Sequence, residues 1–79
     1  MDKNVEINLL LDFYGNLLTD RQKEVMSLYY DDNLSLTEIA EDLSISKQGV
    51  SDILKRSEKT LYDTESKLGL LKEHLESTK

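Results

Sequence analysis

Residues 35–56 read SLTEIAEDLSISKQGVSDILKR and have the pattern of a helix-turn-helix, two short helices joined by a tight turn. Apolar residues recur at helical spacing in both halves, so each helix offers one face to a core. They are Ile39, Ala40 and Leu43 in the first helix, and Val50, Ile53 and Leu54 in the second. We place the small Ala40 where the two helices cross, because a larger side chain there would hold their backbones apart.

The start of each helix carries a residue that can cap its free amide groups. Ser35 followed by Glu38 is a capping box, and Ser46 is the expected N-cap of the second helix. Residues 44–46 then remain for the turn, a length that such motifs use. Any packed pair of helices would show the same apolar stripes. The combination of small residue, turn length and two caps favours the DNA-binding type of helix-turn-helix.

The remaining sequence predicts an all-α fold, a helix-turn-helix bundle of about four to five helices with a long C-terminal helix. Proline is absent and glycine is scarce, which favours helices throughout. Residues 4–17 form a helix that is apolar over most of its circumference. A capping box at Thr19 and Gln22 opens another helix that runs to about residue 31. We expect its buried side to hold Val25, Met26, Leu28 and Tyr29.

The second helix of the motif meets no stop signal before Gly69, where we expect a bend between two helices. Leucines recur every seven residues at positions 54, 61, 68 and 75. This row fits either a short coiled-coil seam or the apolar side of a helix folded back on the domain. We divide the chain into a helix-turn-helix domain, 1–60, and a C-terminal helical extension, 61–79. The extension and the apolar first helix predict a homodimer, because a chain of 79 residues builds only a modest core.

The charge distribution singles out the second motif helix. The net charge of −6 argues against a nucleic-acid binder when it is averaged over the chain. Residues 1–45, however, carry three basic and ten acidic side chains, and residues 61–79 carry three basic and four acidic ones. Residues 46–60 carry four basic and two acidic side chains, a net charge of +2. This segment gives weak support to contact with DNA, since basic residues on a solvated helix are common.

In a DNA complex the amino-terminal part of the second motif helix would enter the major groove of double-stranded DNA. Gln48 could pair with adenine and Lys47 with guanine, whereas Asp52 would accept from cytosine or repel phosphate. Ser46 and the amide groups near it could hold a phosphate, and three further cations would neutralise the backbone. The candidate DNA-binding residues are Ser46, Lys47, Gln48, Ser51, Asp52, Lys55, Arg56 and Lys59. Each of them could equally be an ordinary solvated helix position.

Residues 17–61, LLTDRQKEVMSLYYDDNLSLTEIAEDLSISKQGVSDILKRSEKTL, resemble region four of bacterial sigma factors. The chain is more similar to the YlxM-like family of small bacterial helix-turn-helix proteins. There DFYGNLL, LYYDDNLSL, SKQGVSDILKR and the tail rich in Leu and Lys all have counterparts, over roughly residues 7–75. The resemblance implies a DNA-binding regulator. It also implies a link to protein targeting, because genes of this family commonly lie beside that of the signal recognition particle GTPase. The positions that match the arginine-rich recognition helix of sigma region four hold Lys47, Gln48, Gly49, Ser51 and Asp52, and only Lys47 is cationic. This argues against promoter recognition in the sigma manner.

The residue types needed for catalysis or metal binding are scarce in this sequence. It has no cysteine, and its one histidine, His74, lies in the tail without a second soft ligand. No glycine-rich phosphate loop is present. We therefore expect neither an enzyme nor a bound metal or cofactor. The acidic amino terminus and the lack of a long apolar run predict a cytoplasmic protein with no membrane segment. The alternative function is a protein-protein interaction adaptor that keeps the motif as a scaffold and docks a component of the targeting machinery.

Overall fold

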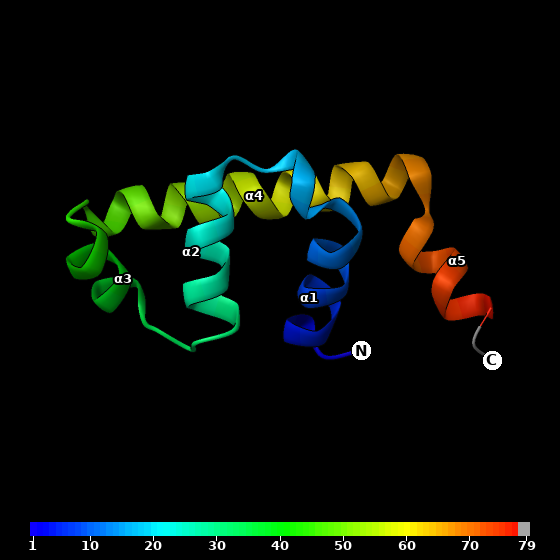
Figure 1. Ribbon diagram of the computed structural model, residues 1–79, viewed down its shortest axis with the longest axis horizontal. Coiled ribbons are helices and arrows are strands. Elements are labelled where there is room, and N and C mark those ends of the chain that lie inside the picture. The colour runs from blue at the N-terminus through cyan, green and yellow to red at the C-terminus, as the bar shows by residue number, and fades with distance from the viewer. Residues whose placement is uncertain (78–79) are drawn as a thin grey trace.

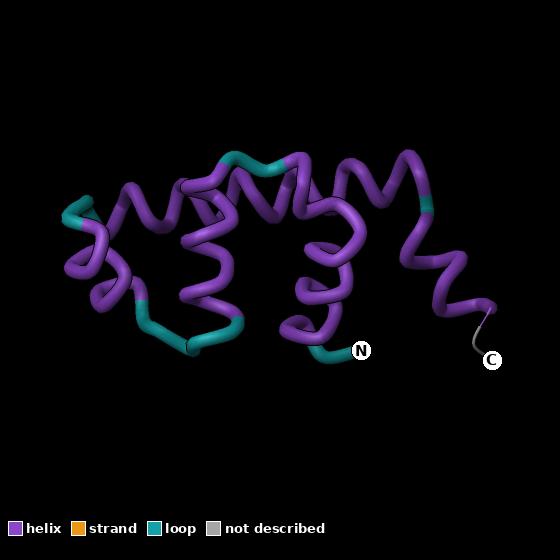
Figure 2. The backbone as a smooth tube through the Cα atoms, viewed as in Figure 1, coloured by secondary structure: helices purple, strands orange, loops and turns teal. Residues whose placement is uncertain are grey.

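The longest element of the fold is a helix of 22 residues that runs along the length of the molecule (Figure 1). The computed structural model describes residues 1–77, in dimensions of 42 × 20 × 16 Å. In chain order their elements are α1 (Lys3–Tyr14), the 3₁₀ turn η1 (Gly15–Leu17), α2 (Asp20–Tyr30), α3 (Leu36–Leu43), α4 (Lys47–Leu68) and α5 (Leu70–Ser77). Helices α1, α2 and α3 lie along one side of α4, and α5 bends away from the axis of α4 at its far end, on the side where α1 lies (Figures 1 and 2). The all-α prediction with its long C-terminal helix is confirmed.

The helix starts that the sequence predicts are present. The Thr19 hydroxyl accepts from the Gln22 amide at 3.2 Å, and the Gln22 side chain accepts from the Thr19 amide at 2.9 Å. Ser35 and Glu38 form the same reciprocal pair at 3.1 and 3.0 Å. Ser46 accepts from the amide of Gly49 at 2.9 Å. These caps fix where α2, α3 and α4 begin, because each satisfies amide groups that have no partner within the helix.

The first helix is shorter than predicted. It ends at Tyr14, and residues 15–17 form a tight 3₁₀ turn in which the Leu18 amide donates to the Gly15 carbonyl at 3.0 Å. Glycine has a low helix propensity, so the α-helix ends easily at Gly15. The 3₁₀ turn then leads to Thr19, the N-cap of α2. The expected apolar cover also divides into two parts. Buried residues are Ile7, Leu10, Tyr14 and Leu18, whereas Val5, Phe13 and Leu17 are exposed.

The core lies where α1, α2 and α3 pack against α4. Its largest fully buried side chains are apolar and come from each of these helices: Ile7, Leu10, Met26, Ile39 and Leu61, with Val25 and Val50. The prediction that Tyr29 belongs to the buried side of α2 was wrong by one residue. Tyr30 is buried, and Tyr29 is exposed. Either tyrosine lies one turn after a buried residue. Which of the two is buried depends on the direction in which α4 crosses α2. The sequence of α2 alone does not determine that direction.

The predicted bend at Gly69 is confirmed. Its φ is +64°, a left-handed conformation that ends α4 and that glycine adopts without strain. The chain then folds back, and Leu71 of α5 is buried in the core beside α1. The leucine row is thereby divided, since Leu61 is buried whereas Leu68 is 60% exposed. The structure thus agrees with the second interpretation of the leucine row, in which the end of the chain packs on its own domain.

Helix α4 passes without interruption through residues 60 and 61, where we drew the border between domain and extension. The last two residues of the predicted extension, 78 and 79, lie outside the described part of the chain. Among residues 1–77, no helix combines the length and the apolar character needed to span a bilayer.

Candidate nucleic-acid interface

The turn between α3 and α4 sets the direction in which α4 leaves the motif. Ser44 adopts a left-handed conformation, with a φ of +56°, and closes α3. The Ile45 amide then donates to the Ala40 carbonyl at 3.0 Å, which holds the turn against the last residues of α3. Ile45 itself packs against the core as a half-buried residue. The start of α4 is therefore fixed relative to α3 by backbone bonds and packing, as a recognition helix requires.

All eight candidate DNA-binding residues lie at the start of α4 or within its first four turns. Four of them, Gln48, Asp52, Lys55 and Lys59, are spaced four, three and four residues apart, so they form one line on the helix. The opposite side of α4 is buried, with Val50, Leu54, Ser57 and Leu61. Ser51 is half-buried, and the seven other candidates are exposed. The structure therefore brings the candidate residues together on the outward side of one helix.

Two of the candidate DNA-binding side chains, those of Gln48 and Lys59, already bind acidic residues of α4. The Gln48 amide donates to the Asp52 carboxylate at 3.0 Å, and Lys59 pairs with Asp63 at 2.7 Å. The bond to Asp63 and the attraction between the two charges raise the pKa of Lys59. Sequence reasoning considered Asp52 as a repulsive group but missed that it holds the amide of Gln48. The separation of four residues was the available signal, because such pairs meet on a helix.

Gly49 is a residue whose role sequence reasoning missed. A methyl group at this position would lie 3.1 Å from the Ser46 hydroxyl oxygen, which is closer than ordinary contact. The lack of a side chain at Gly49 therefore leaves room for the cap that begins α4. Ser46 was predicted both as a cap and as a phosphate contact. Its oxygen accepts from the Gly49 amide in the structure, and the hydroxyl proton is the group that it can still donate to a phosphate.

The outer side of α3 is acidic. Glu38, Glu41 and Asp42 are all exposed, on the side away from Ile39 and the core. With Leu34, they line a shallow hollow beside the motif. In helix-turn-helix complexes the first helix crosses the DNA backbone, where carboxylates repel phosphate. Any approach of DNA must therefore favour the α4 side of the motif over the outer side of α3.

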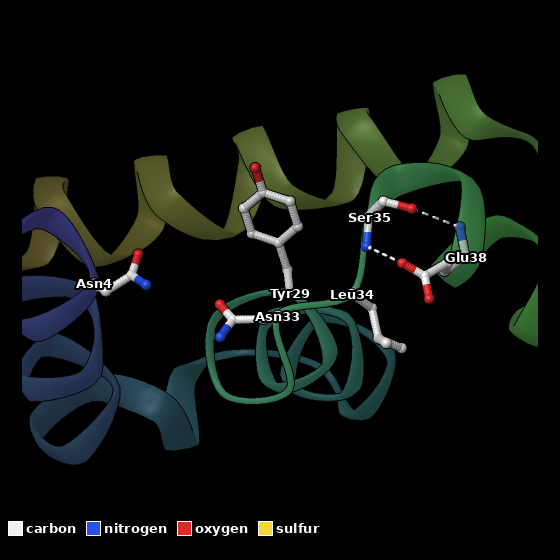
Figure 3. Close-up of a pocket in the computed structure, with 6 residues that line it drawn as sticks. All are labelled: Asn4, Tyr29, Asn33, Leu34, Ser35 and Glu38. Atoms are coloured by element: carbon white, nitrogen blue, oxygen red, sulfur yellow. Dashed lines mark hydrogen bonds between the residues drawn. The ribbon is translucent and has the colours of Figure 1, made fainter.

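A second hollow lies between the amino-terminal end of α1, the end of α2 and the start of α3. Figure 3 shows the six residues that line it: Asn4, Tyr29, Asn33, Leu34, Ser35 and Glu38. The carboxylate of Glu38 is engaged by the Ser35 amide, as the dashed lines show. The lining is thus mostly polar, and two of its six residues, Ser35 and Glu38, are committed to the cap of α3. Across residues 1–77, no three acidic or histidine side chains gather as ligands for a metal ion.

Comparison with known proteins identifies the family. The sequence model of the UPF0122 family, whose description is "Putative helix-turn-helix protein, YlxM / p13 like", matches residues 1–79. The chain belongs to this family. A UPF0122 protein of Clostridium botulinum is 49% identical over 79 residues, which cover all of this chain and 72% of the relative. A second, of Caldanaerobacter subterraneus subsp. tengcongensis, is 55% identical over 73 residues, covering 92% of this chain and 62% of the relative.

A third UPF0122 relative, from Thermoanaerobacter sp., is 56% identical over 70 residues, which cover 89% of this chain and 60% of the relative. The chain therefore spans 60 to 72% of the length of these three relatives. The family description names a helix-turn-helix and no catalytic activity. The resemblance to YlxM-like proteins drawn from the sequence is thus confirmed over the whole chain, and so is the helix-turn-helix.

Proposed function

We propose that this UPF0122 protein is a DNA-binding regulatory protein that reads double-stranded DNA with the amino-terminal half of α4. The observation that carries the proposal is the outward line of Gln48, Asp52, Lys55 and Lys59. The fold does not use these side chains in its core, and they stand on the helix that follows the turn. A major groove accepts an α-helix, and side chains at its start reach the edges of the bases.

The roles within the proposed interface follow from position along α4. Lys47 and Gln48 lie in the first turn and would contact bases. Lys55, Arg56 and Lys59 lie further along and would contact phosphates, which position the protein without reading sequence. Gln48 must first break its 3.0 Å hydrogen bond to Asp52 before it can form its paired bonds to adenine. Both side chains are exposed, so Gln48 can exchange this bond for one to a base. The net charge of +2 over residues 46–60 supports the phosphate contacts.

Selection of genomic fragments by the purified protein, followed by binding assays on the enriched fragments, tests the proposal. The double variant Lys47→Ala plus Lys55→Ala should bind these fragments at least tenfold more weakly, because it removes two cations from the proposed interface. The matched control is Lys67→Ala plus Lys72→Ala, which removes the same charge from exposed positions far from the turn. The control should retain native affinity. Equal losses in both double variants would show that binding is not centred on α4.

The acidic outer side of α3 favours a second candidate function, that of a protein-protein interaction adaptor. Glu38, Glu41 and Asp42 offer a surface for a basic partner protein, and the motif would then serve as a scaffold. The partner that the family resemblance implies is a component of the protein-targeting machinery. Replacing the three carboxylates with their amides should abolish capture of that partner under this reading. Under the DNA-binding reading, the same change should tighten binding to DNA.

A further inference from the structure

Helix α5 is a short helix that packs on α1 and on the end of α4. It is joined to α4 through the single residue Gly69, and it is eight residues long. Leu71 is its buried residue, and Leu75 is half-buried against the core. The ring of His74 lies against that of Phe13 on α1, with centroids 5.7 Å apart. A helix of this length is marginal in water without support. Its docked position therefore depends on a small set of interactions.

The amide groups at the start of α5 are bound by residues from two other helices. The Glu65 carboxylate of α4 accepts from the Leu71 amide at 2.9 Å and from the Lys72 amide at 3.1 Å. The Tyr14 hydroxyl of α1 accepts from the Leu70 amide at 3.1 Å and donates to Glu65 at 2.7 Å. One carboxylate thus connects α1, α4 and α5. Burial works to raise the pKa of Glu65, but the hydrogen bonds that it accepts lower it on balance.

The same amide groups would find another set of partners if the backbone conformation of one residue, Gly69, changed. Glycine adopts right-handed helical and left-handed conformations with similar ease. If Gly69 became right-handed, the amides of Leu71 and Lys72 could bond the carbonyls four residues earlier, as in any α-helix. Helices α4 and α5 would then form one continuous helix. Leu68 and Leu75, seven residues apart, would share one side of it.

We propose that α5 is a hinged segment, which leaves α1 by rotation at Gly69 and continues α4 as one helix while α1 to α4 stay folded. Glu65 holds the docked form, because its carboxylate binds amides that only the docked form leaves without partners. Leu68, which is 60% exposed in the docked form, would lie on the same side of the extended helix as Leu75. The hinge thus switches between burying Leu71 in the chain's own core and presenting Leu68 and Leu75 together.

Spin labels on introduced cysteines can follow the hinge, since the natural chain has no cysteine. One label pair, Lys23→Cys with Glu73→Cys, joins α2 to α5. A second pair, Lys23→Cys with Arg56→Cys, joins α2 to α4 and reports on the rest of the fold. All three positions are exposed. The variant Glu65→Ala should increase the population with a long α2–α5 distance roughly tenfold, because it removes the cap of α5.

The matched control is Asp63→Ala, which removes an exposed carboxylate from the same helix without touching α5. It should keep the native α2–α5 distance, and Tyr14→Phe should give an intermediate shift. The α2–α4 distance and the helical content by circular dichroism should stay unchanged in every variant. An unchanged α2–α5 distance in Glu65→Ala would overturn the hinge. A broad spread of distances with lower helical content would overturn the continuation of α4, and a shift of the α2–α4 pair would show that α5 does not move independently.

Discussion

At the scale of single residues, the exposed side of α4 combines groups that attract DNA with one that repels it. Asp52 lies between the first-turn residues and Lys55, and it holds the amide of Gln48 at 3.0 Å. In the free protein this bond restrains Gln48, and the carboxylate lowers the local positive charge. Both effects would weaken contact with DNA of arbitrary sequence. Asp52 is therefore a residue that can trade affinity for selectivity.

We expect Asp52→Asn to bind arbitrary double-stranded DNA roughly three- to tenfold more tightly at about 0.1 M salt. The change removes one negative charge from the side that faces phosphate. On an enriched fragment the gain in affinity should be smaller, because the substitution also removes the contact of the Asp52 carboxylate with cytosine. Fluorescence anisotropy on both kinds of DNA measures the difference. If Asp52→Asn leaves both affinities at the native value, the outward side of α4 does not face DNA.

At the scale of the elements, local signals predicted the helix starts and tertiary packing decided the rest. Ser35 and Ser46 could be assigned from sequence because a cap joins residues three apart along the chain. The burial of Tyr30 in place of Tyr29, and the docking of α5 on α1, depend on contacts between residues far apart in sequence. The bond from Tyr14 to Glu65 spans 51 residues. The sequence around Tyr14 does not indicate Glu65 as its partner, and the sequence around Glu65 does not indicate Tyr14.

The same reasoning applies to the candidate site. Its residues could be placed on one helix from the sequence, since the turn and the caps fixed the register of α4. The pairing of Gln48 with Asp52 was accessible from their spacing of four. The space that Gly49 leaves for Ser46 was not accessible, because it depends on the path of the backbone before the helix begins.

The contact between α3 and α4 gives a direct test of how the motif is packed. Ala40 is half-buried and packs against the core. Ala40→Leu should lower the free energy of unfolding by about 1–3 kcal/mol, because the added atoms must displace well-packed neighbours. Glu41→Leu, on the exposed side of the same helix, is the control and should change stability far less. A chemical denaturation midpoint of Ala40→Leu that equals the native one would show that α3 and α4 are loosely packed at this position.

At the scale of the whole molecule, the proposal of a homodimer rests on exposed apolar residues. Leu17 and Leu68 are each 60% exposed, and Val5 is 51% exposed. Burial of apolar surface yields about 25 cal/mol for each Å², so a second copy could gain by covering them. A two-fold pair would also present two α4 helices to a two-fold DNA site.

We predict that the native chain is a dimer at tens of micromolar and that Leu17→Glu combined with Leu68→Glu shifts it to the monomer mass of 9.1 kDa. A buried glutamate at an interface costs far more than it does on a free surface. Ser66→Glu, which adds one charge at an exposed position near Leu68, is the control and should remain dimeric. Light scattering with a column separation gives both masses. A native chain that elutes as a clean monomer would contradict the proposal.

The measurement that tests DNA binding by α4 most directly is the dependence of affinity on salt. Each phosphate contact releases counterions, so the logarithm of the binding constant should fall linearly with the logarithm of the salt concentration. With Lys55, Arg56 and Lys59 on phosphates, we predict a slope of about three for each chain bound. Lys47→Ala plus Lys55→Ala should flatten this slope by about one for each chain, because Lys55 lies on a phosphate in the proposed interface whereas Lys47 lies on a base. An affinity that does not change with salt, or a slope that is the same in the double variant and the native protein, would contradict the proposal.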